Sequence, residues 1–510
     1  MIISELVRVQ EEEGWISPDA ARSMASRLGV PLHRVEGVLS FYPHFRRTPP
    51  VRIEIAACRD MACSLRGGRA LFQAAKALAS ADVIVREVSC LGRCDDAPAV
   101  FINGIPLHEA TADKLVRIMR GEEPCPTADP LPPPRPFFLP SSDLAPPPPP
   151  QTVDPDKVIA ALKEAGLRGL GGAGFPTADK WSLVRKATST PKYVICNADE
   201  SEPGTFKDRA LLEGSPHLVL DGLALAAQVI NAAKGIIYLR HEYDRALRAL
   251  SKALAERHDL PCPVEIFVSP GGYILGEETA LLEALEDRRG EPRNKPPFPG
   301  TSGLHGQPTL INNVETLAAA ATIWRRGAPW WNAQGVRGSS GLKLVSVSGH
   351  VVRPGVYEIP MGTTVSELIG MAGGCTGKLL AFAPGGASSR FLPADKADTP
   401  IDFGSIQAAG SMLGSGALVV VAEGTDMHDL ATNIVRFFRN ESCGKCVPCR
   451  LGGERAVVIL EEVAAGKRGR GDLALLDEIE EAMRLTSICG LGQVALQAAL
   501  SIRDRFSSSP

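Results

Sequence analysis

Apolar residues in the first 44 positions recur at the spacing of amphipathic helices. Leu6 and Val9 fall on one face, as do Met24 and Leu28, and Ser17-Pro18 has the composition of a helix start. The pattern predicts a small unit of three helices over residues 1–50.

The periodicity changes at residue 51, where apolar and polar positions begin to alternate. Alternation predicts a strand over 51–55 and a second over 83–88, with a helix between them over 68–79. Asn103-Gly104, after the apolar residues 99–102, is typical of a tight hairpin turn. We therefore expect a thioredoxin-like α/β domain over 51–120.

A proline-rich stretch follows, over residues 121–154. Thirteen of the 41 prolines lie between Pro124 and Pro150, and the last five are consecutive. Such a composition is compatible with extended polyproline or a disordered linker. The stretch divides the chain into two parts.

Beyond the linker the pattern alternates between short apolar strands and amphipathic helices. This alternation over 155–340 predicts a Rossmann-like α/β domain with a parallel sheet. Residues 341–425 are rich in short strands with one helix and predict a β-grasp-like (ubiquitin-like) insert, and residues 426–510 predict a helical bundle. The expected fold class is multidomain α/β and α+β.

Length and composition limit the possible functions. At about 150 residues per domain, 510 residues suggest three or four domains. With 44% apolar residues, 22% charged residues and a net charge of -3, the chain shows no general affinity for nucleic acid or an anionic membrane. No apolar run is long enough to insert in a membrane, since Asp221 and Gln228 interrupt 218–230. The first residues lack a secretory pattern, so we expect a cytoplasmic protein.

Eight of the twelve cysteines form two groups. In the second group, Cys443, Cys446 and Cys449 lie within seven residues, and Cys489 follows at a distance. This three-plus-one spacing favours a [4Fe-4S] cluster, whereas structural zinc usually takes two paired knuckles.

The first group consists of two pairs, Cys58 with Cys63 and Cys90 with Cys94. Four thiolates from two loops suit a [2Fe-2S] cluster or zinc, and the spacing alone leaves both open. No C-x-x-C redox motif is present in this group. The four remaining cysteines are expected to be small buried side chains without an assigned role: Cys125, Cys196, Cys262 and Cys375.

A glycine-rich segment, residues 168–181, contains a literal G-x-G-x-x-G. The dinucleotide fingerprint requires a preceding strand, but here a helix is predicted. Glycines still let backbone N–H groups approach a phosphate or a ring, Lys180 adds a cation, and Phe175 adds a stacking face. A turn required only for packing is the alternative.

Acidic and amide residues follow the strand that ends at Cys196, over 197–209. This is the carboxyl end of a parallel strand, where open α/β sheets bind ligands. Three later segments, 272–279, 295–298 and 312–316, again combine amides, carboxylates or an aromatic ring at loop–helix junctions. A solvated charge run is the usual alternative for 197–209, and each of the three later segments alone is more often a helix cap or a turn than a site.

Together these motifs resemble the NADH-binding flavoprotein subunit of respiratory complex I, and the diaphorase subunits of NAD-dependent formate dehydrogenases and NAD-reducing hydrogenases. The motifs are RGLGGAGFPTADKW, NADESEPGTFKDR, YILGEETALLEALE, KPPFP, INNVETL and ESCGKCVPCR, within residues 155–505. Residues 1–120, with QEEEGWISPDA and GVLSFYPHF, resemble the small [2Fe-2S] subunit of the same systems. The resemblance implies two subunits fused through the proline linker.

The resemblance implies site residues for both nucleotides. FMN would be held by Gly169, Gly171, Lys180, Asn197, Asp199, Glu200, Tyr273, Gly276, Glu277, Asn312, Asn313 and Thr316. NADH would be held by Phe175, Lys180, Glu202, Glu278, Lys295 and Phe298. The chain departs from the family at Leu170, often Arg, and at Leu183, often aromatic. No catalytic side chain is implied, because hydride passes directly between NAD(H) and FMN.

The implied function follows from the cofactors. Nicotinamide carries electron pairs, clusters carry single electrons, and a flavin converts between them. We expect the diaphorase subunit of a soluble NAD-dependent formate dehydrogenase, in a hetero-oligomer with a molybdenum or tungsten subunit that carries further iron–sulfur clusters. An NAD-reducing hydrogenase with a nickel subunit, or complex I itself, are the alternatives, since the distinguishing metal lies on another polypeptide. A zinc-containing, non-catalytic assembly protein is a remote alternative.

Overall fold

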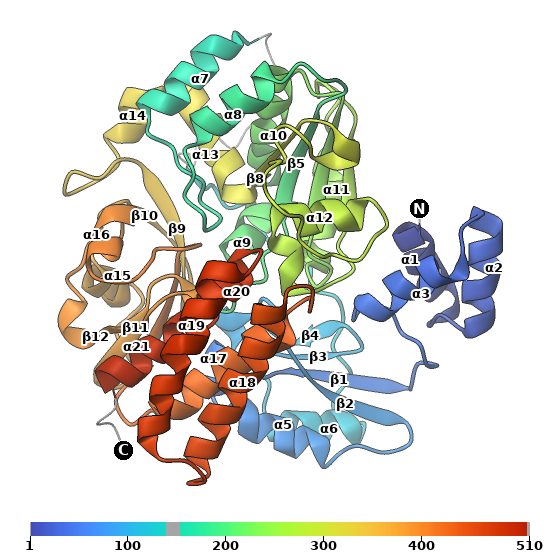
Figure 1. Ribbon diagram of the computed structural model, residues 1–510, viewed down its shortest axis with the longest axis vertical. Helices are drawn as coiled ribbons and strands as arrows, with labels where there is room; N and C mark the ends of the chain where they lie inside the picture. Colours follow the sequence, from blue (N-terminus) through green and yellow to red (C-terminus); the bar gives the residue numbers. More distant parts are fainter. Residues whose placement is uncertain (1, 139–152, 507–510) are drawn as a thin grey trace.

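The computed structural model describes residues 2–138 and 153–506, and the Pro146–Pro150 run lies outside the described residues. The chain forms an α/β domain, a strand-rich domain, a C-terminal helical domain and two N-terminal units (Figure 1). None of the described helices is both long and apolar enough to span a membrane.

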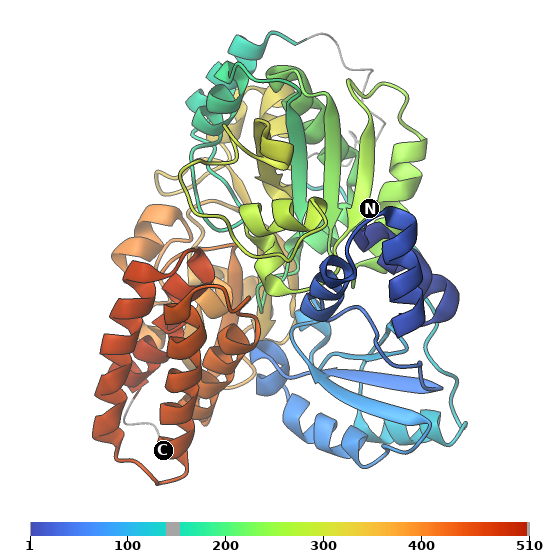
Figure 2. The ribbon, with the colours of Figure 1, turned by 45° about the vertical axis from the view of Figure 1, so that its right-hand side comes forward.

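The three predicted N-terminal helices are present, although they do not form a separate core. They are α1 (Ile2–Glu13), α2 (Pro18–Leu28) and α3 (Leu32–Phe41). Leu6 and Val35 share one hydrophobic cluster with Leu275 and Leu281 of the α/β domain. The Tyr42 hydroxyl also donates to the Arg288 carbonyl at 2.5 Å. The helical unit therefore packs on the α/β domain, beside which it lies in Figure 2.

The thioredoxin-like prediction is confirmed by a four-stranded sheet in the order β2-β1-β3-β4. Its elements are β1 (Ile53–Cys58), α4 (Met61–Leu65), α5 (Gly68–Lys76), β2 (Val83–Val88), β3 (Val100–Ile102), β4 (Ile105–Leu107) and α6 (Ala112–Met119). Asn103 and Gly104 both have positive φ, 51° and 80°, as the predicted hairpin turn requires. The strand predicted from residue 51 begins at Ile53 instead.

The described parts of the proline-rich stretch, residues 121–138 and 153–154, contain no helix or strand, yet the end of the first part is anchored. Phe137 and Phe138 are each 1% exposed. The Arg135 nitrogen donates to the Gly214 carbonyl at 3.0 Å, and the Phe138 nitrogen donates to Glu358 at 2.9 Å. This end of the stretch is therefore held between the α/β domain and the strand-rich domain.

The α/β domain has the predicted parallel sheet, in the order β7-β6-β5-β8. Its elements are α7 (Pro155–Glu164), α8 (Thr177–Lys186), β5 (Tyr193–Ala198), α9 (Lys207–Gly214), α10 (Pro216–Ile230), β6 (Lys234–Leu239), α11 (Asp244–Ala255), β7 (Val264–Val268), α12 (Glu278–Leu285), β8 (Thr309–Asn313), α13 (Val314–Arg326) and α14 (Ala328–Asn332). Because side chains alternate along a strand, Val194 and Cys196 pack toward α10 and α13, while Ile195 joins the cluster on the other face.

The strand-rich domain is a mixed five-stranded sheet in the order β10-β9-β13-β11-β12, with β9 and β13 parallel at its centre. Its elements are β9 (Leu342–Gly349), β10 (Gly355–Pro360), α15 (Val365–Met371), β11 (Leu379–Ala383), β12 (Leu392–Pro393), α16 (Phe403–Ala408) and β13 (Ala417–Ala422). This arrangement agrees with the β-grasp-like prediction.

The C-terminal domain is helical, as predicted. Its helices are α17 (Met427–Asn440), α18 (Val447–Ala464), α19 (Leu475–Thr486), α20 (Gly490–Val494) and α21 (Gln497–Phe506). In Figure 2 this domain and the thioredoxin-like domain both lie below the parallel sheet. Both domains that carry cysteine groups therefore lie next to the α/β domain.

Candidate functional site

The candidate site lies at the carboxyl edge of the parallel sheet. The chain runs from β5 through β6 to β7 on one side and returns to β8 on the other side of β5. This reversal makes a switch point between β5 and β8, where open α/β sheets bind ligands. Asn197 and Asp199 at the end of β5 therefore face the same edge as Asn312 and Asn313 of β8.

The glycine-rich loop connects α7 to α8 and packs against the start of α13. The Leu170 nitrogen donates to the Thr316 hydroxyl at 2.9 Å, and the Gly169 nitrogen donates to the Phe175 carbonyl at 2.8 Å. A Cβ on Gly171 would lie 2.7 Å from the Asn313 Cβ. Only glycine permits this approach, so the loop fits a role as a backbone cradle for a flavin phosphate or ring.

Two cations of the predicted site are paired with two neighbouring carboxylates. Lys180 donates to Glu278 and, at 2.6 Å, to the Ile311 carbonyl. Lys295 donates to Glu277 at 2.7 Å. Glu277 also accepts hydrogen bonds from the first turn of α12. Lys180, predicted for both nucleotides, and Glu277, predicted for FMN, are thus each paired with a residue predicted for NADH.

Two acids after β5 are almost fully buried. Burial raises the pKa of Asp199 to about 7 and that of Glu200 to about 7. Asp199 accepts hydrogen bonds from Ser201 at 3.0 Å and Ser269 at 3.3 Å. Glu200 accepts from two backbone nitrogens of α9, at 2.8 and 3.0 Å, and from the Tyr243 hydroxyl at 2.9 Å. The Glu200 carboxylate thus caps the N-terminus of α9 and fixes the loop that carries Asp199.

Glu202 and Tyr273 connect the α/β domain to the strand-rich domain. The Tyr273 hydroxyl donates to Glu202 at 2.7 Å, and the Ser388 nitrogen donates to the same carboxylate at 2.7 Å. Burial raises the pKa of Glu202. The Tyr273 ring makes edge contacts with Phe437 and Phe438 of α17, at centroid distances of 5.0 and 6.1 Å. Three domains meet at Tyr273.

The other predicted residues are hydrogen-bonded polar groups and exposed aromatic rings. The Asn197 amide donates to the Gly276 carbonyl at 2.9 Å, and Trp181 donates to Asn312 at 2.9 Å. Phe175 and Phe298 are 55% and 58% exposed and present their rings to solvent. Such exposed aromatic rings are suited to stacking on a nucleotide that enters from outside.

The first cysteine group is buried against the α/β domain. Cys58 ends β1, Cys63 lies in α4, and Cys90 and Cys94 lie on the loop after β2. The Sγ atoms of Cys90 and Cys94 are 3.5 Å apart. Neighbouring Cys58 and Cys94 lower the pKa of Cys90. Four buried thiols with one favoured as thiolate fit the donor set of an iron–sulfur cluster.

The second group surrounds the start of α18. Cys443 and Cys446 lie on the loop after α17, Cys449 is in the first turn of α18, and Cys489 directly precedes α20. A Cβ on Gly492 would lie 3.0 Å from the Cys449 Cβ, so the two segments are in contact. Burial raises the pKa of Cys449 to about 11 and that of Cys489 to about 12, and metal binding displaces such protons. Among the described residues no three potential ligands are arranged to hold a single metal ion.

Three residues connect the two thiol groups to the site without having been predicted as site residues. Arg209 and Glu441 belong to motifs noted in the sequence, whereas Arg240 lies outside them. Arg240 donates to the Cys90 and Glu200 carbonyls, and Arg209 donates to the Gly92 carbonyl at 2.6 Å. Glu441 accepts from Ser89 and from the Tyr273 nitrogen. Arg240 directly follows β6, at the same sheet edge as Asp199. Its position after a parallel strand is the feature of the sequence that could have indicated a role at the site.

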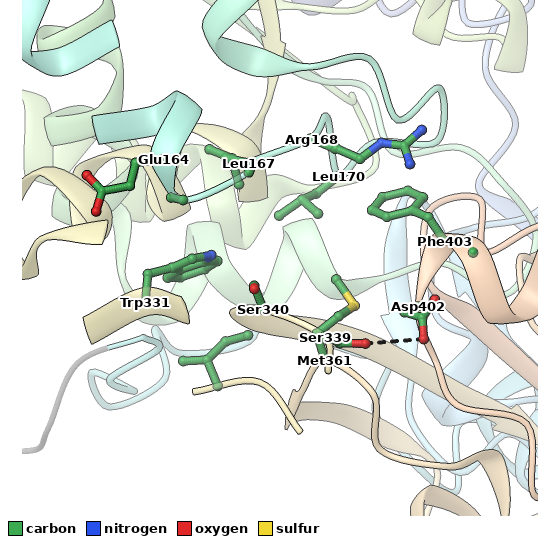
Figure 3. Close-up of a pocket in the computed structure, with 14 residues that line it drawn as sticks. Glu164, Leu167, Arg168, Leu170, Trp331, Ser339, Ser340, Met361, Asp402 and Phe403 are labelled. Carbon is green, nitrogen blue, oxygen red and sulfur yellow. Dashed lines mark hydrogen bonds between the residues drawn. The ribbon is translucent and has the colours of Figure 1, made fainter. Parts of the chain in front are cut away.

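A cavity of about 280 Å³ lies behind the glycine-rich loop, between the α/β and strand-rich domains (Figure 3). Arg168, Trp331, Ser340 and Phe403 line it, and the Arg168 guanidinium stacks on the Phe403 ring at 4.4 Å. None of the residues predicted for FMN or NADH lines this cavity. It is therefore separate from the site at the sheet edge.

A parallel α/β domain with a glycine-rich loop, joined to two domains that each carry four cysteines, has the architecture of an iron–sulfur flavoprotein. Family models agree along the chain. Residues 1–122 match the thioredoxin-like [2Fe-2S] ferredoxin, 162–322 the Nuo51 FMN-binding domain, 344–391 the SLBB domain, and 429–509 the iron–sulfur binding region of NADH-ubiquinone oxidoreductase-F.

Individual relatives agree with this class. The F 2 subunit of the NADH-quinone oxidoreductase of Rhizobium meliloti is 46% identical over 68% of this chain and 86% of its own length. The HndC subunit of the NADP-reducing hydrogenase of Solidesulfovibrio fructosivorans is 39% identical over 70% of this chain and 76% of its own. The crystal structure of an air-oxidized NAD+-reducing [NiFe]-hydrogenase matches 99% of this chain and 92% of the solved chain, with a TM-score of 0.90 and 35% identity.

The chain belongs to the family of the F subunits of NADH-quinone oxidoreductases. It is an NADH dehydrogenase-type oxidoreductase component of a hetero-oligomeric complex, and its cofactors are FMN, NAD(H), a [2Fe-2S] cluster and a [4Fe-4S] cluster. The resemblance identified from the sequence is confirmed, and the iron–sulfur descriptions favour these cofactors over the zinc alternative.

Proposed function

We propose that this chain is the diaphorase subunit of a soluble, cytoplasmic NAD-dependent formate dehydrogenase. The observation that carries the proposal is the fusion of the [2Fe-2S] domain to the flavoprotein in one chain, with both parts docked at one site. In respiratory complex I the equivalent parts are usually separate chains. A fused chain therefore favours an NAD-linked enzyme with a separate catalytic subunit over complex I. The proposal assigns molybdenum or tungsten to that catalytic subunit.

The twelve residues predicted for FMN would hold the flavin at the switch point, and the six predicted for NADH would hold the nucleotide at its open side. When bound, FMN supplies the exchange between two-electron and one-electron transfer. The protein's part is to bind the two nucleotides and to orient them. Glu278 and Glu277 already fix Lys180 and Lys295. Binding of a nucleotide to these ammonium groups therefore costs little further side-chain entropy.

The two thiol groups would hold the two clusters. Cys443, Cys446, Cys449 and Cys489 are the proposed ligands of the [4Fe-4S] cluster. Cys58, Cys63, Cys90 and Cys94 are the proposed ligands of the [2Fe-2S] cluster. Support comes from their position, since the two loops contact Tyr273 and Glu200 of the flavin site through Glu441 and Arg240.

A diaphorase subunit of an NAD-reducing hydrogenase is the second candidate. The solved hydrogenase chain covers nearly this whole chain, including the fused N-terminal part. The two candidates share the reaction of this subunit and differ in the metal of the partner.

The test is to purify the native complex through an affinity tag on this chain and measure its metals and its electron donor. Molybdenum or tungsten together with formate-dependent reduction of NAD+ supports the proposal. Nickel together with hydrogen-dependent reduction supports the second candidate instead. Copurification with membrane subunits and quinone reduction would assign the chain to complex I. The isolated chain should reduce a dye with NADH in all three cases.

A further inference from the structure

Two arginines of the α/β domain reach across to the loop that carries Cys90 and Cys94. Arg240, directly after β6, is 3% exposed and donates to the Cys90 carbonyl. Arg209, in α9, is 4% exposed and donates to the Gly92 carbonyl at 2.6 Å. Both guanidinium groups therefore lie against the backbone of the cysteine loop.

The backbone of the Cys90–Cys94 loop lies close to the α/β domain at Gly92. Gly92 has φ of +67°, and a Cβ there would lie 2.7 Å from the Tyr243 ring. The Tyr243 hydroxyl donates to Glu200 at 2.9 Å, and Arg240 donates to the Glu200 carbonyl. The cysteine loop, the two arginines and the flavin loop thus form one buried contact.

Each arginine also has an acidic partner, so the charges are oriented and not isolated. Glu242 accepts from Arg240 Nε at 2.8 Å and Nη2 at 3.1 Å. Asp95 accepts from Arg209 at 2.5 Å. Arg240 Nη2 donates to both Glu242 and the Cys90 carbonyl, so the positive group is inserted between the carboxylate and the cysteine loop.

We infer that Arg240 and Arg209 are positioning residues that raise the reduction potential of the [2Fe-2S] cluster. The inference rests on the proposed assignment of Cys58, Cys63, Cys90 and Cys94 to that cluster. Reduction adds one negative charge to a four-thiolate cluster. Net charge and hydrogen bonding around a cluster set its potential, and a buried cation stabilises the more negative, reduced form. The flavin domain therefore adjusts how readily the cluster accepts an electron.

The alternative is that the arginines only hold the two domains together. Docking affects stability and cofactor content, whereas a charge effect moves the midpoint potential of an intact cluster. The potential is therefore the readout that separates the two roles.

The experiment uses the full chain with its cofactors and an EPR-monitored redox titration of the [2Fe-2S] signal. Arg240→Met should lower the ratio of reduced to oxidised cluster at a fixed potential by about tenfold, which is 59 mV for one electron. Arg240→Lys should retain most of the wild-type potential. Glu242→Gln, which removes the opposing charge, should shift the potential upward. Arg209→Met should shift it downward.

Two controls belong to the same titration. The [4Fe-4S] signal of each variant should keep its potential, because the hydrogen bonds of both arginines go to the cysteine loop and the α/β domain and not to the C-terminal helices. Arg257→Met removes another arginine whose side chain is only 6% exposed and pairs with Asp221 and Asp259, and it should leave the [2Fe-2S] potential unchanged.

An intact [2Fe-2S] signal with wild-type potential in Arg240→Met overturns the inference, as does an equal shift in Arg257→Met. If Arg240→Met does not retain the cluster, the opposite shifts expected of Glu242→Gln and Arg209→Met provide the test. Absence of a [2Fe-2S] signal in the wild-type chain would instead contradict the proposed assignment of the four cysteines as cluster ligands. The outcome does not depend on whether formate or hydrogen is the donor.

Discussion

The Glu441 carboxylate accepts a hydrogen bond from the backbone nitrogen of Tyr273 at 2.9 Å. Its other oxygen accepts from the Ser89 hydroxyl. Glu441 precedes Cys443 by two residues, and Ser89 directly precedes Cys90. One side chain therefore connects the loops of both thiol groups to the predicted flavin site.

Glu441→Ala should weaken this junction. The Tyr273 N–H and the Ser89 hydroxyl would lose their acceptor, at a cost of about 1–3 kcal/mol. We expect a lower melting temperature and faster release of FMN, measured by thermal unfolding and flavin fluorescence. The matched control is Glu454→Ala in the same domain, since Glu454 is 59% exposed and its nearest cation, on Arg439, is 3.6 Å away. Unchanged stability and flavin release in Glu441→Ala would show that the junction is not needed.

Phe298→Ala should affect NADH and leave FMN in place. Phe298 is 58% exposed at the open side of the site, and loss of one aromatic contact costs about 0.5–1.5 kcal/mol. We expect up to about a tenfold rise in KM for NADH in dye reduction, with an unchanged flavin content. Val352→Ala, at a 55% exposed apolar residue of the strand-rich domain, is the control. Loss of flavin from Phe298→Ala would contradict the proposed division between flavin and nucleotide residues.

Cys489→Ser should separate the two routes of electron flow. The variant lacks one proposed ligand of the [4Fe-4S] cluster, so the iron content should fall by about four per chain. Transfer to the partner subunit should be lost, while NADH-dependent reduction of a small dye that reaches the flavin directly should continue. Cys125 lies outside both groups and is exposed, so the burial predicted for it from the sequence is wrong. Cys125→Ser should change neither measurement. Full iron content in Cys489→Ser would remove Cys489 from the ligand set.

Much of the fold could be predicted from the sequence, because the periodicity of buried positions is local. The alternation over 83–88 corresponds to β2 without a shift, and the helical pattern predicted over 426–510 corresponds to α17 to α21. The acidic and amide segment over 197–209 leaves a parallel strand as predicted, although β5 ends at Ala198 and not at Cys196, so the first two residues of the segment belong to the strand. Local patterns and strand direction were sufficient for these features.

The contacts between domains could not be predicted in this way. Arg240 and Cys90 are 150 residues apart, and no local pattern indicates that the arginine contacts the cysteine loop. Glu441 and Tyr273 are 168 residues apart. Glu200 was predicted as a flavin residue, but its capping of α9 depends on how the chain turns after β5. Docking is set by tertiary packing, which a single sequence does not display.

A second buried network joins the α/β domain to the strand-rich domain. Glu315 of α13 accepts from Lys343 of β9 at 2.5 Å and lies 3.0 Å from Lys207 of α9, and all three side chains are 0% exposed. Asp208 pairs with Lys207 at 2.7 Å and accepts from Asn313, which packs on the glycine-rich loop. The network therefore supports the flavin loop from behind.

Glu315→Gln should destabilise the chain strongly. Removing one partner of a buried ion pair leaves uncompensated charge, which typically costs about 3–5 kcal/mol. We expect a lower urea concentration at the unfolding midpoint, together with a lower FMN content. The control is Glu265→Gln, because Glu265 pairs with Lys234 at 2.8 Å on the surface, where such pairs contribute about 0–1 kcal/mol. Equal effects of the two variants would contradict the importance of the buried network.

Two histidines form part of the contact between the N-terminal helical unit and the α/β domain. The rings of His44 and His241 have centroids 4.5 Å apart. Burial, followed by the neighbouring His241, lowers the pKa of His44 to about 4, and burial also lowers the pKa of His241. Arg46 and Arg240 oppose protonation of the pair and Glu242 favours it. The contact is therefore most stable when both histidine rings are neutral.

Docking of the helical unit should therefore weaken in acid. An unfolded histidine has a pKa of about 6.5, so between that pH and about 4 the undocked state binds a proton that the folded state does not, and stability falls as the pH is lowered. We expect hydrogen-exchange protection of α1 to α3 to decrease between pH 7.5 and 5.5. His44→Phe should show a smaller decrease, whereas His33→Phe, on the exposed side of α3, should match the wild type. Burial raises the pKa of Asp199 and of Glu200 to about 7, so these two acids have the opposite effect on stability as the pH is lowered. Their effect is the same in every variant and cancels in the comparison. An equal loss of protection in wild type and His44→Phe would assign the pH dependence to other groups.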